Sequence, residues 1–283
     1  MSLALGLGDV EIVTADSMQV YKGMDIGTAK PTTAERAGVP HHLVDVATPQ
    51  EDWDVSRFVR EASAIVDAIV ARGKTALLVG GTGLYVHALV DGFSVPGRWP
   101  EVARQVDELP TDEIYRRLAE LDAAAAAKIE PGNRRRAARA LEVTLGGKRF
   151  SEYGPGVGAF APTDWRLAGV WLPRQVVARR VEERFDAMVR DGLVDEVSAL
   201  AQGPGLSRTS SQALGYRELL AYLRGELDWE AARRLVIDRT RQFARRQRMW
   251  WRRDPRVRWY GSPSEPSDIV PALLRDWGHA GAI

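Results

Sequence analysis

Two turns in the sequence carry side chains that could do chemistry, and each follows a run typical of a buried strand. Asp16 follows the β-branched run VEIVTA at 10–15, and Thr82 stands in the turn Gly80–Gly83 after KTALLV at 74–79. A carboxylate can take a proton from a weak nucleophile, and the N–H groups of a glycine-rich turn before a helix can bind an anion. An Asp after a strand is also a common turn or helix cap, and GGTG is also a common tight connection. The two turns indicate either a proton acceptor beside an anion site or two purely structural turns.

The charges of the chain are concentrated in two basic segments. Lys and Arg total 39 against 38 Asp and Glu, so the formal net charge is only +1. Residues 233–258 contain eleven Arg and two Asp, a local charge of +9, and residues 134–149 carry +5, which leaves −13 for the rest of the chain. Such segments are typical of nucleic-acid binding. A solvated Arg-rich helix, or the base composition of the genome, would give the same pattern.

The order of the expected elements predicts an α/β protein. A helix expected over 55–72 precedes the strand at 74–79, and another helix begins at Leu84 after the glycine-rich turn. Helix, apolar strand, glycine-rich turn and helix is the order found in parallel sheets, where ligands bind at the carboxyl ends of the strands. Asp16 and Thr82 both fall at such ends.

The character of the sequence changes after Pro96-Gly97. The later elements we expect are a helical stretch over 100–147, a Gly/Pro loop at 151–163, strands at 166–172 and 256–260, and helices at 174–201 (broken at Gly192) and 229–252. We therefore expect an α/β core in two parts, 1–99 and 166–283, around an all-helical insertion over 100–165.

The composition excludes several classes of protein. The chain has no Cys, so disulfides and Cys-ligated metals are absent, and it has no apolar run long enough to span a bilayer. The start MSLALGLGDVE lacks the basic region of a signal peptide, so we expect a soluble, cytoplasmic protein. His41 and His42 have no third ligand at metal-binding spacing, which favours a structural role within a PHHL turn.

Six stretches together identify a family. They are ADSMQVYKGMDIGTAKP (15–31), VPHHLVDV (39–46), LLVGGTGLYVHAL (77–89), RRAARALEV (135–143), QALGYREL (212–219) and TRQFARRQRMWW (240–251). In type and order they resemble the bacterial tRNA dimethylallyltransferases, also called isopentenyl-tRNA transferases, and the resemblance runs from about residue 2 to residue 260. It implies a core related to the P-loop nucleotide kinases, with a helical insertion that contacts tRNA.

The resemblance implies a reaction. Enzymes of this family transfer a dimethylallyl group from dimethylallyl diphosphate to the N6 amine of the adenosine on the 3′ side of the anticodon, in tRNAs that read codons beginning with U. The expected partners are a tRNA anticodon stem-loop and dimethylallyl diphosphate, with Mg²⁺ as the cofactor of the diphosphate. No residue identifies the ligands of the metal. We expect a monomer that does not bind membranes.

The resemblance also assigns roles to residues. Asp16 is implied as the general base for the adenine amine, with Thr82 beside it at the transfer site. The residues expected to contact tRNA are Asp16, Ser17, Met18, Gln19, Thr82, Arg104, Arg135, Arg136, Arg139, Gln212, Gly215, Tyr216, Arg217, Arg245, Arg246, Gln247 and Arg252. Those expected at the diphosphate are Gly80, Gly81, Arg184 and Arg217. For Arg184 and Arg217 a surface ion pair is the alternative, and Trp250 or Trp251 could either stack on a base or pack in the core.

One feature of the family is not found in the sequence. The family opens with a strand and a G-x-x-x-x-G-K-[ST] phosphate loop, and no such motif occurs here, although Ser2–Leu7 resembles the helix that follows the loop. A misassigned start or a truncated chain is one explanation, favoured because every later motif is present. A genuine loss of the loop is the other. Either way, we expect this chain to bind dimethylallyl diphosphate poorly and to expose sheet edges.

Two other functions remain open. The first is a non-catalytic tRNA-binding relative, which a genuine loss of the phosphate loop would favour. The second is a small-molecule kinase with a similar core, against which both basic segments and the lack of any phosphate loop count. Transfer of the prenyl group, tRNA binding without transfer, and phosphorylation by ATP without tRNA distinguish the three.

Overall fold

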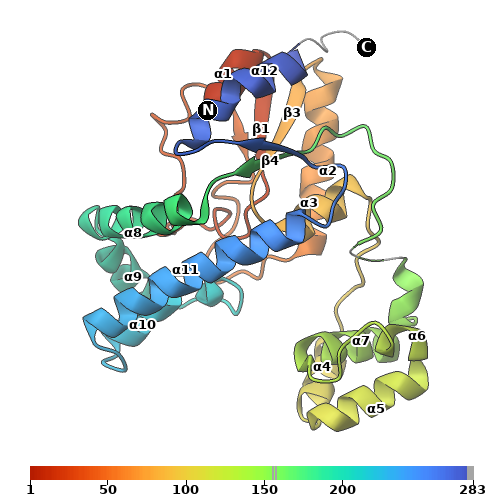
Figure 1. Cartoon of the computed structure of the whole chain (residues 1–283). Coiled ribbons are helices and arrows are strands. Elements are labelled where there is room, and N and C mark those ends of the chain that lie inside the picture. Colours follow the sequence, from red (N-terminus) through yellow and green to blue (C-terminus); the bar gives the residue numbers. More distant parts are fainter. Residues whose placement is uncertain (155, 157, 279–283) are drawn as a thin grey trace. The chain divides into compact units, whose positions relative to one another are not determined.

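The computed structural model describes all residues of the chain except 155, 157 and 279–283. The described chain divides into two compact units, residues 1–86 with 162–283 and residues 87–161 (Figure 1). Each unit has its own core, so the two are described separately. None of the described helices combines the length and the apolar character needed to cross a membrane.

A three-stranded parallel sheet forms the centre of the first unit. Its order is β2 (His41–His42), β1 (Val10–Thr14) and β3 (Thr75–Val79), so β1 has a partner on both edges. Every residue of β1 is buried, whereas both ends of β3 are exposed. The asymmetry follows from pairing, because β3 hydrogen-bonds to β1 on one edge only.

Helices cover this sheet. The helix α2 (Val55–Ala71) begins where the Asp54 carboxylate accepts the N–H of Arg57 at 2.9 Å, and its Phe58 stacks on Tyr85 at 4.6 Å between ring centroids. The helices α1 (Ser2–Leu7) and α12 (Val270–Gly278) lie side by side in Figure 1. Their close approach requires Gly6, since a Cβ there would lie 2.7 Å from Leu274.

A second, two-stranded parallel sheet pairs β4 (Ala168–Trp171) with β5 (Arg258–Gly261). Four helices occupy the sequence between these strands: α8 (Arg174–Arg190), α9 (Leu193–Gln202), α10 (Tyr216–Leu223) and α11 (Trp229–Trp251). Short 3-10 turns lie at Ser210–Gln212 and Pro266–Ile269. The predicted break at Gly192 is confirmed: its φ of 100° lies in the left-handed region that glycine tolerates, and it separates α8 from α9.

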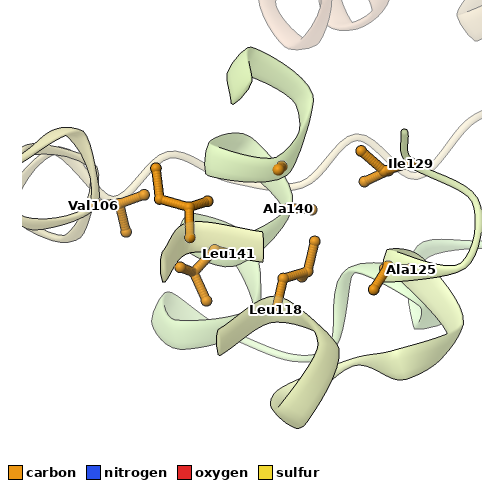
Figure 2. Packing of buried hydrophobic residues seen from close by; sticks show 9 residues of the cluster. Val106, Leu118, Ala125, Ile129, Ala140 and Leu141 are labelled. Atoms are coloured by element: carbon orange, nitrogen blue, oxygen red, sulfur yellow. The ribbon is translucent and has the colours of Figure 1, made fainter. Parts of the chain in front are cut away.

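The second unit contains only helices among its described residues. They are α4 (Pro100–Asp107), α5 (Thr111–Leu121), α6 (Ala123–Ala126), α7 (Arg134–Gly146) and a 3-10 turn at Phe150–Tyr153; α3 (Gly83–Val90) crosses the boundary between the units. Ile114, Leu118 and Leu141 are fully buried in its core, which Figure 2 shows from close by. The apolar faces of α5 and α7 thus pack on each other.

The α/β fold class is confirmed, and the predicted strands at 10–15, 74–79, 166–172 and 256–260 all occur within one or two residues of these bounds. The helical unit begins at residue 87, earlier than the predicted 100. The prediction of a PHHL turn is wrong, because His41 and His42 pair with β1 as a strand. Two residues are too short for an alternating pattern to reveal a strand. Two positions of the predicted 151–163 loop, Pro155 and Val157, lie outside the described residues.

Candidate active site

A pocket of about 350 Å³ lies at the carboxyl end of β1, where the sequence places Asp16. Both Asp16 and Thr82 line it, together with Arg184 of α8 and with Arg246 and Gln247 of α11. The fold therefore brings together residues from four separate stretches of the sequence. Apolar side chains of α8, α9 and α11 form part of its walls.

Asp16 is anchored by the chain that follows it. Its Oδ1 atom accepts the N–H of Met18 at 2.8 Å and that of Gln19 at 3.3 Å. The other oxygen, Oδ2, accepts no hydrogen bond from the residues that the structure describes. The structural turn and the chemical role are thus compatible, since one oxygen forms the turn and the second is left for a ligand.

Thr82 is held against the same turn. Its Oγ1 accepts the N–H of Ser17 at 3.3 Å, which links the ends of β1 and β3. Packing requires the glycine at position 80, because a Cβ on Gly80 would lie 2.2 Å from the backbone carbonyl oxygen of Ala15. A Cβ on Gly81 would lie 2.0 Å from Nε2 of Gln247, the end of a flexible side chain that can move aside. The tight connection is therefore a sufficient reason for Gly80, and the contact of Gly80 and Gly81 with diphosphate stays a prediction.

Arg184 is a cation that lines this pocket. It forms no ion pair or hydrogen bond with any residue in the described ranges. Partial withdrawal from water lowers the pKa of Arg184, the nearby Arg180 lowers it further, and the charge of Asp16 raises it. A cation without an acidic partner in a pocket is suited to an anionic ligand.

The turn at 24–30 forms one wall of the pocket through Gly27 and Thr28. Glu196 of α9 holds it from behind: its carboxylate accepts the N–H groups of Asp25 at 2.9 Å, Ile26 at 2.8 Å and Gly27 at 3.2 Å. The hydroxyl of Tyr216 donates to the same carboxylate at 2.5 Å. Sequence reasoning missed Glu196, because no local pattern links α9 to this turn.

Gln19 and Tyr216 are occupied by this turn. The Gln19 side-chain amide donates to the carbonyls of Thr28 at 3.1 Å and Ala29 at 3.2 Å. Tyr216 is fully buried, and a Cβ on Gly27 would lie 2.5 Å from its ring. Burial and the bond to Glu196 raise the pKa of Tyr216, so its hydroxyl stays a donor. Both side chains hold the turn in this structure, and their contacts with tRNA stay a prediction.

The other predicted residues near α10 lie at different depths. Gln212 and Gly215 line the pocket, whereas Arg217 does not. Arg217 is exposed, and its Nε lies 3.9 Å from a carboxylate oxygen of Glu218. The alternative of a surface ion pair therefore fits Arg217, whereas Arg184 forms no such pair among the described residues.

The arginines of α11 divide into two groups along the helix. In the first half, Arg233, Arg239 and Arg241 pair with the acidic side chains of Asp186, Glu218 and Glu182. Arg234 is the exception in this half, because it is exposed and pairs with no acid among the described residues. In the second half, Arg245, Arg246 and Arg252 are exposed and pair with no acid in the described part of the chain. Arg248 lies over the ring of Trp171, 4.1 Å from its centroid, and burial and the charges of Arg174 and Arg252 lower its pKa.

In the second unit, neighbouring arginines also differ. Arg135 and Arg136 on α7 are exposed, and neither forms an ion pair with a described residue. Arg139 instead donates to the carbonyls of Pro96 at 2.9 Å and Gly97 at 2.7 Å and pairs with Glu142 at 2.6 Å. Arg104 is exposed but pairs with Glu101.

No metal centre is evident. Among residues 1–154, 156 and 158–278, no three His, Asp or Glu side chains are grouped as metal ligands. His42 bonds through Nε2 to the buried Glu11 at 2.7 Å, and this bond, with those from Lys74 and Arg72, holds the pKa of Glu11 at about 2. His41 bonds through Nδ1 to the carbonyl of Val39. The structural role predicted for this pair is in line with these contacts.

The fold and the pocket define a class of protein. An aspartate, a threonine and an unpaired arginine meet at the carboxyl ends of parallel strands, and Arg246 lines the same pocket. This is the arrangement of an α/β transferase whose substrates carry phosphate groups.

Comparison with known proteins identifies the family. The model of the family described as IPP transferase matches residues 19–254, and the chain belongs to this family. It is 47% identical to a tRNA dimethylallyltransferase of Kineococcus radiotolerans, over 93% of this chain and 85% of the relative. A relative in Salinispora arenicola with the same name is 46% identical, over 97% of this chain and 81% of the relative.

Two crystal structures have the same fold. The full-length tRNA isopentenylpyrophosphate transferase of Bacillus halodurans matches with a TM-score of 0.71 and 34% identity, over 97% of this chain and 88% of that one. A eukaryotic dimethylallyltransferase acting on tRNA matches with a TM-score of 0.78 and 25% identity, over 97% of this chain and 73% of that one. The predicted P-loop-kinase-like core is therefore confirmed at the level of the fold.

Proposed function

We propose that this protein transfers a dimethylallyl group from dimethylallyl diphosphate to the N6 amine of the adenosine next to the anticodon, on its 3′ side, in tRNAs reading codons that begin with U. The names of the relatives support the tRNA substrate and the prenyl donor. The observation that carries the proposal is the pocket in which Asp16, Thr82 and Arg184 meet.

The pocket suits the steps of this reaction. The N6 lone pair is delocalised into the adenine ring, so the amine is a weak nucleophile until its proton has an acceptor. A new N–C bond forms as the C–O bond to diphosphate breaks, Oδ2 of Asp16 accepts the N6 proton, and the diphosphate leaves with the bonding electrons. Arg184 offsets the negative charge that develops on the leaving group. The base must leave its stack to reach Asp16, which a splayed anticodon loop allows.

Mg²⁺ belongs to this proposal only through the diphosphate. The described residues offer no cage for the ion, and Mg²⁺ is commonly held by one or two carboxylates together with substrate phosphates. Among the residues that the structure describes, Asp16 is the only carboxylate lining the pocket. We therefore propose that the ion arrives bound to the diphosphate, and no step is assigned to it. A monomer acting in the cytoplasm completes the proposal.

The test is a prenyl-transfer assay with radiolabelled dimethylallyl diphosphate and an unmodified tRNA anticodon stem-loop. It is run on residues 1–283 and on the same chain extended at its N-terminus by a strand and a G-x-x-x-x-G-K-[ST] loop. Label on the adenosine N6, with faster transfer by the extended protein, is expected. Tight stem-loop binding without transfer by either protein would favour the non-catalytic relative. ATP-dependent phosphorylation of a small molecule without RNA would favour the kinase.

A further inference from the structure

A lysine that the proposed reaction does not use is buried next to the wall of the pocket. Lys30 is the last residue of the 24–30 turn, and its side chain is 4% exposed. Its Nζ donates to the carbonyl of Tyr21 at 2.6 Å, to Oδ1 of Asp45 at 2.6 Å and to Oδ1 of Asp25. An ammonium group has three hydrogens, so each of them has an acceptor here. A charge withdrawn from water is costly unless it is paired in this way.

The backbone on both sides of this lysine is strained. Ala29, Leu43 and Asp45 have φ values of 52°, 60° and 58°, in the left-handed region that residues with a Cβ rarely adopt. Ala29 directly precedes Lys30, and Asp45 is one of its acceptors. Such conformations persist only where surrounding contacts hold them. The bonds of Lys30 are contacts of this kind, because they join the two strained segments.

The turn that contains Lys30 is linked to Asp16 through a single side chain. The Gln19 amide donates to the carbonyls of the two residues that precede Lys30, at 3.1 and 3.2 Å. The backbone N–H of Gln19 donates to Oδ1 of Asp16 at 3.3 Å, and the Gln19 carbonyl accepts the N–H of Asp45 at 3.3 Å. Gln19 therefore connects both strained segments with the proposed proton acceptor.

Two side chains hold this turn by different means. Glu196 accepts the N–H groups of residues 25–27, whereas Lys30 ties the turn to the two neighbouring segments of the chain. Gly27 and Thr28 of the turn line the pocket. The conformation of this part of the wall therefore depends on a buried cation as well as on a carboxylate.

We propose that Lys30 is a positioning residue of the transfer reaction, which acts on Asp16 through the 24–30 turn and Gln19. Lys30 does not line the pocket, so it acts through these contacts and not on a substrate. Its ammonium group keeps the turn in its strained conformation, and the turn keeps Gln19 bonded to Oδ1 of Asp16, which fixes the direction of Oδ2. The effect on transfer rests on the proposed function, whereas the effect on Asp16 does not.

The first test needs no substrate. It measures amide hydrogen exchange residue by residue in residues 1–283 with Lys30→Met, which replaces the ammonium by an unbranched apolar side chain. Exchange at the amides of Met18 and Gln19, which bind Oδ1 of Asp16, is expected to become faster by about tenfold or more. The amide of Ile12 in β1 is the internal control and is expected to stay within about twofold. Equal acceleration at Ile12, or unchanged exchange at the other two amides, would overturn the proposal.

Two further variants make this test specific. Lys74→Met is the matched control, because Lys74 also bonds to a buried carboxylate, that of Glu11 at 3.1 Å, near the amino end of β1. It is expected to leave exchange at residues 18 and 19 unchanged, and equal acceleration by this variant would count against Lys30. Asp45→Asn serves if Lys30→Met does not fold, since Asn tolerates the left-handed conformation and keeps an oxygen for the ammonium. About two- to fivefold faster exchange at the same two amides is expected, and no change would overturn the proposal.

The second test is single-turnover transfer by the N-terminally extended protein with saturating substrates. Lys30→Met is expected to lower the rate constant by roughly 10- to 100-fold, while the amplitude of the reaction and the stem-loop affinity stay within about threefold. A purely structural role would lower the amplitude, which counts the folded protein, and leave the rate constant unchanged; that result would overturn the proposal. If the extended protein without substitutions transfers nothing, the proposed function fails, and the exchange measurements still decide whether Lys30 holds Asp16.

Discussion

The pocket around Asp16 and the free arginines of the basic segments differ in how firmly the fold holds them. In the pocket, Asp16, Thr82 and Glu196 each bond to backbone groups of the neighbouring turns. Arg135 and Arg245 bond to no described residue and extend into solvent. Proton transfer needs fixed geometry, whereas attraction to a polyanion needs only charge. We therefore expect single changes to have large effects in the pocket and small effects in the basic segments.

The sharpest test of this comparison is Asp16→Asn in the extended protein. The amide oxygen keeps the bonds to Met18 and Gln19, while the proton acceptor is lost. Transfer under single-turnover conditions is expected to slow by roughly 10²- to 10⁴-fold, with stem-loop affinity within a few fold. Turnover close to that of the unchanged protein would mean that Asp16 stabilises the turn but is not the proton acceptor.

The next effect concerns the unpaired cation of the pocket. Arg184→Gln removes the charge that we propose faces the diphosphate, and it is expected to raise KM for dimethylallyl diphosphate about 10- to 100-fold, the equivalent of a lost hydrogen bond to a charged group. Arg180→Gln on the same helix is the control, because Arg180 pairs with Glu265 at 2.8 Å. A similar rise in KM in both variants would mean that α8 attracts the diphosphate through its overall positive charge and not through Arg184 in particular.

The sequence predicted which residues line this pocket better than it predicted the contacts that hold them in place. Asp16 and Thr82 could be placed because each follows an apolar strand, and the carboxyl ends of parallel strands share one edge. The fold class and most strands followed from the same patterns. Glu196 could not be found, because it acts on a turn that lies about 170 residues away in the sequence, and nothing local marks it.

For the arginines, the sequence located the basic segments but could not predict the contacts of each side chain. Composition located both basic segments, but it could not tell Arg139, which bonds to Pro96 and Gly97, from Arg136 three residues earlier. Which arginine is free depends on the side chains and carbonyls that the folded chain brings near it. For the same reason, composition could not show which arginines of α11 pair with the acidic side chains of α8 and α10.

A smaller effect is expected when the wall of the pocket is loosened. Glu196→Gln places an amide donor against the N–H groups of the 24–30 turn, and we expect it to lower the free energy of unfolding by about 1–3 kcal/mol and transfer by about tenfold. The matched control is Glu182→Gln on α8, which breaks an exposed pair with Arg241. Thermal unfolding, together with exchange of the amides at 25–27, separates the two. Equal loss of transfer in both variants would show that the contact of Glu196 with the 24–30 turn has no specific role in transfer.

The smallest effects belong to the second unit, where Arg135→Gln or Arg136→Gln removes one free charge. Each is expected to weaken stem-loop binding about two- to fivefold and to reduce the slope of log affinity against log salt by about 0.7–0.9. Arg116→Gln is the control in the same unit, because Arg116 already pairs with Glu113 at 2.7 Å and its loss should leave the slope unchanged. Arg139→Gln is expected to lower the melting temperature instead, since it breaks bonds within the fold. A salt slope that is the same in all four variants would mean that these arginines face solvent even when RNA is bound, and the contrast with the Asp16 pocket would then rest on α11 alone.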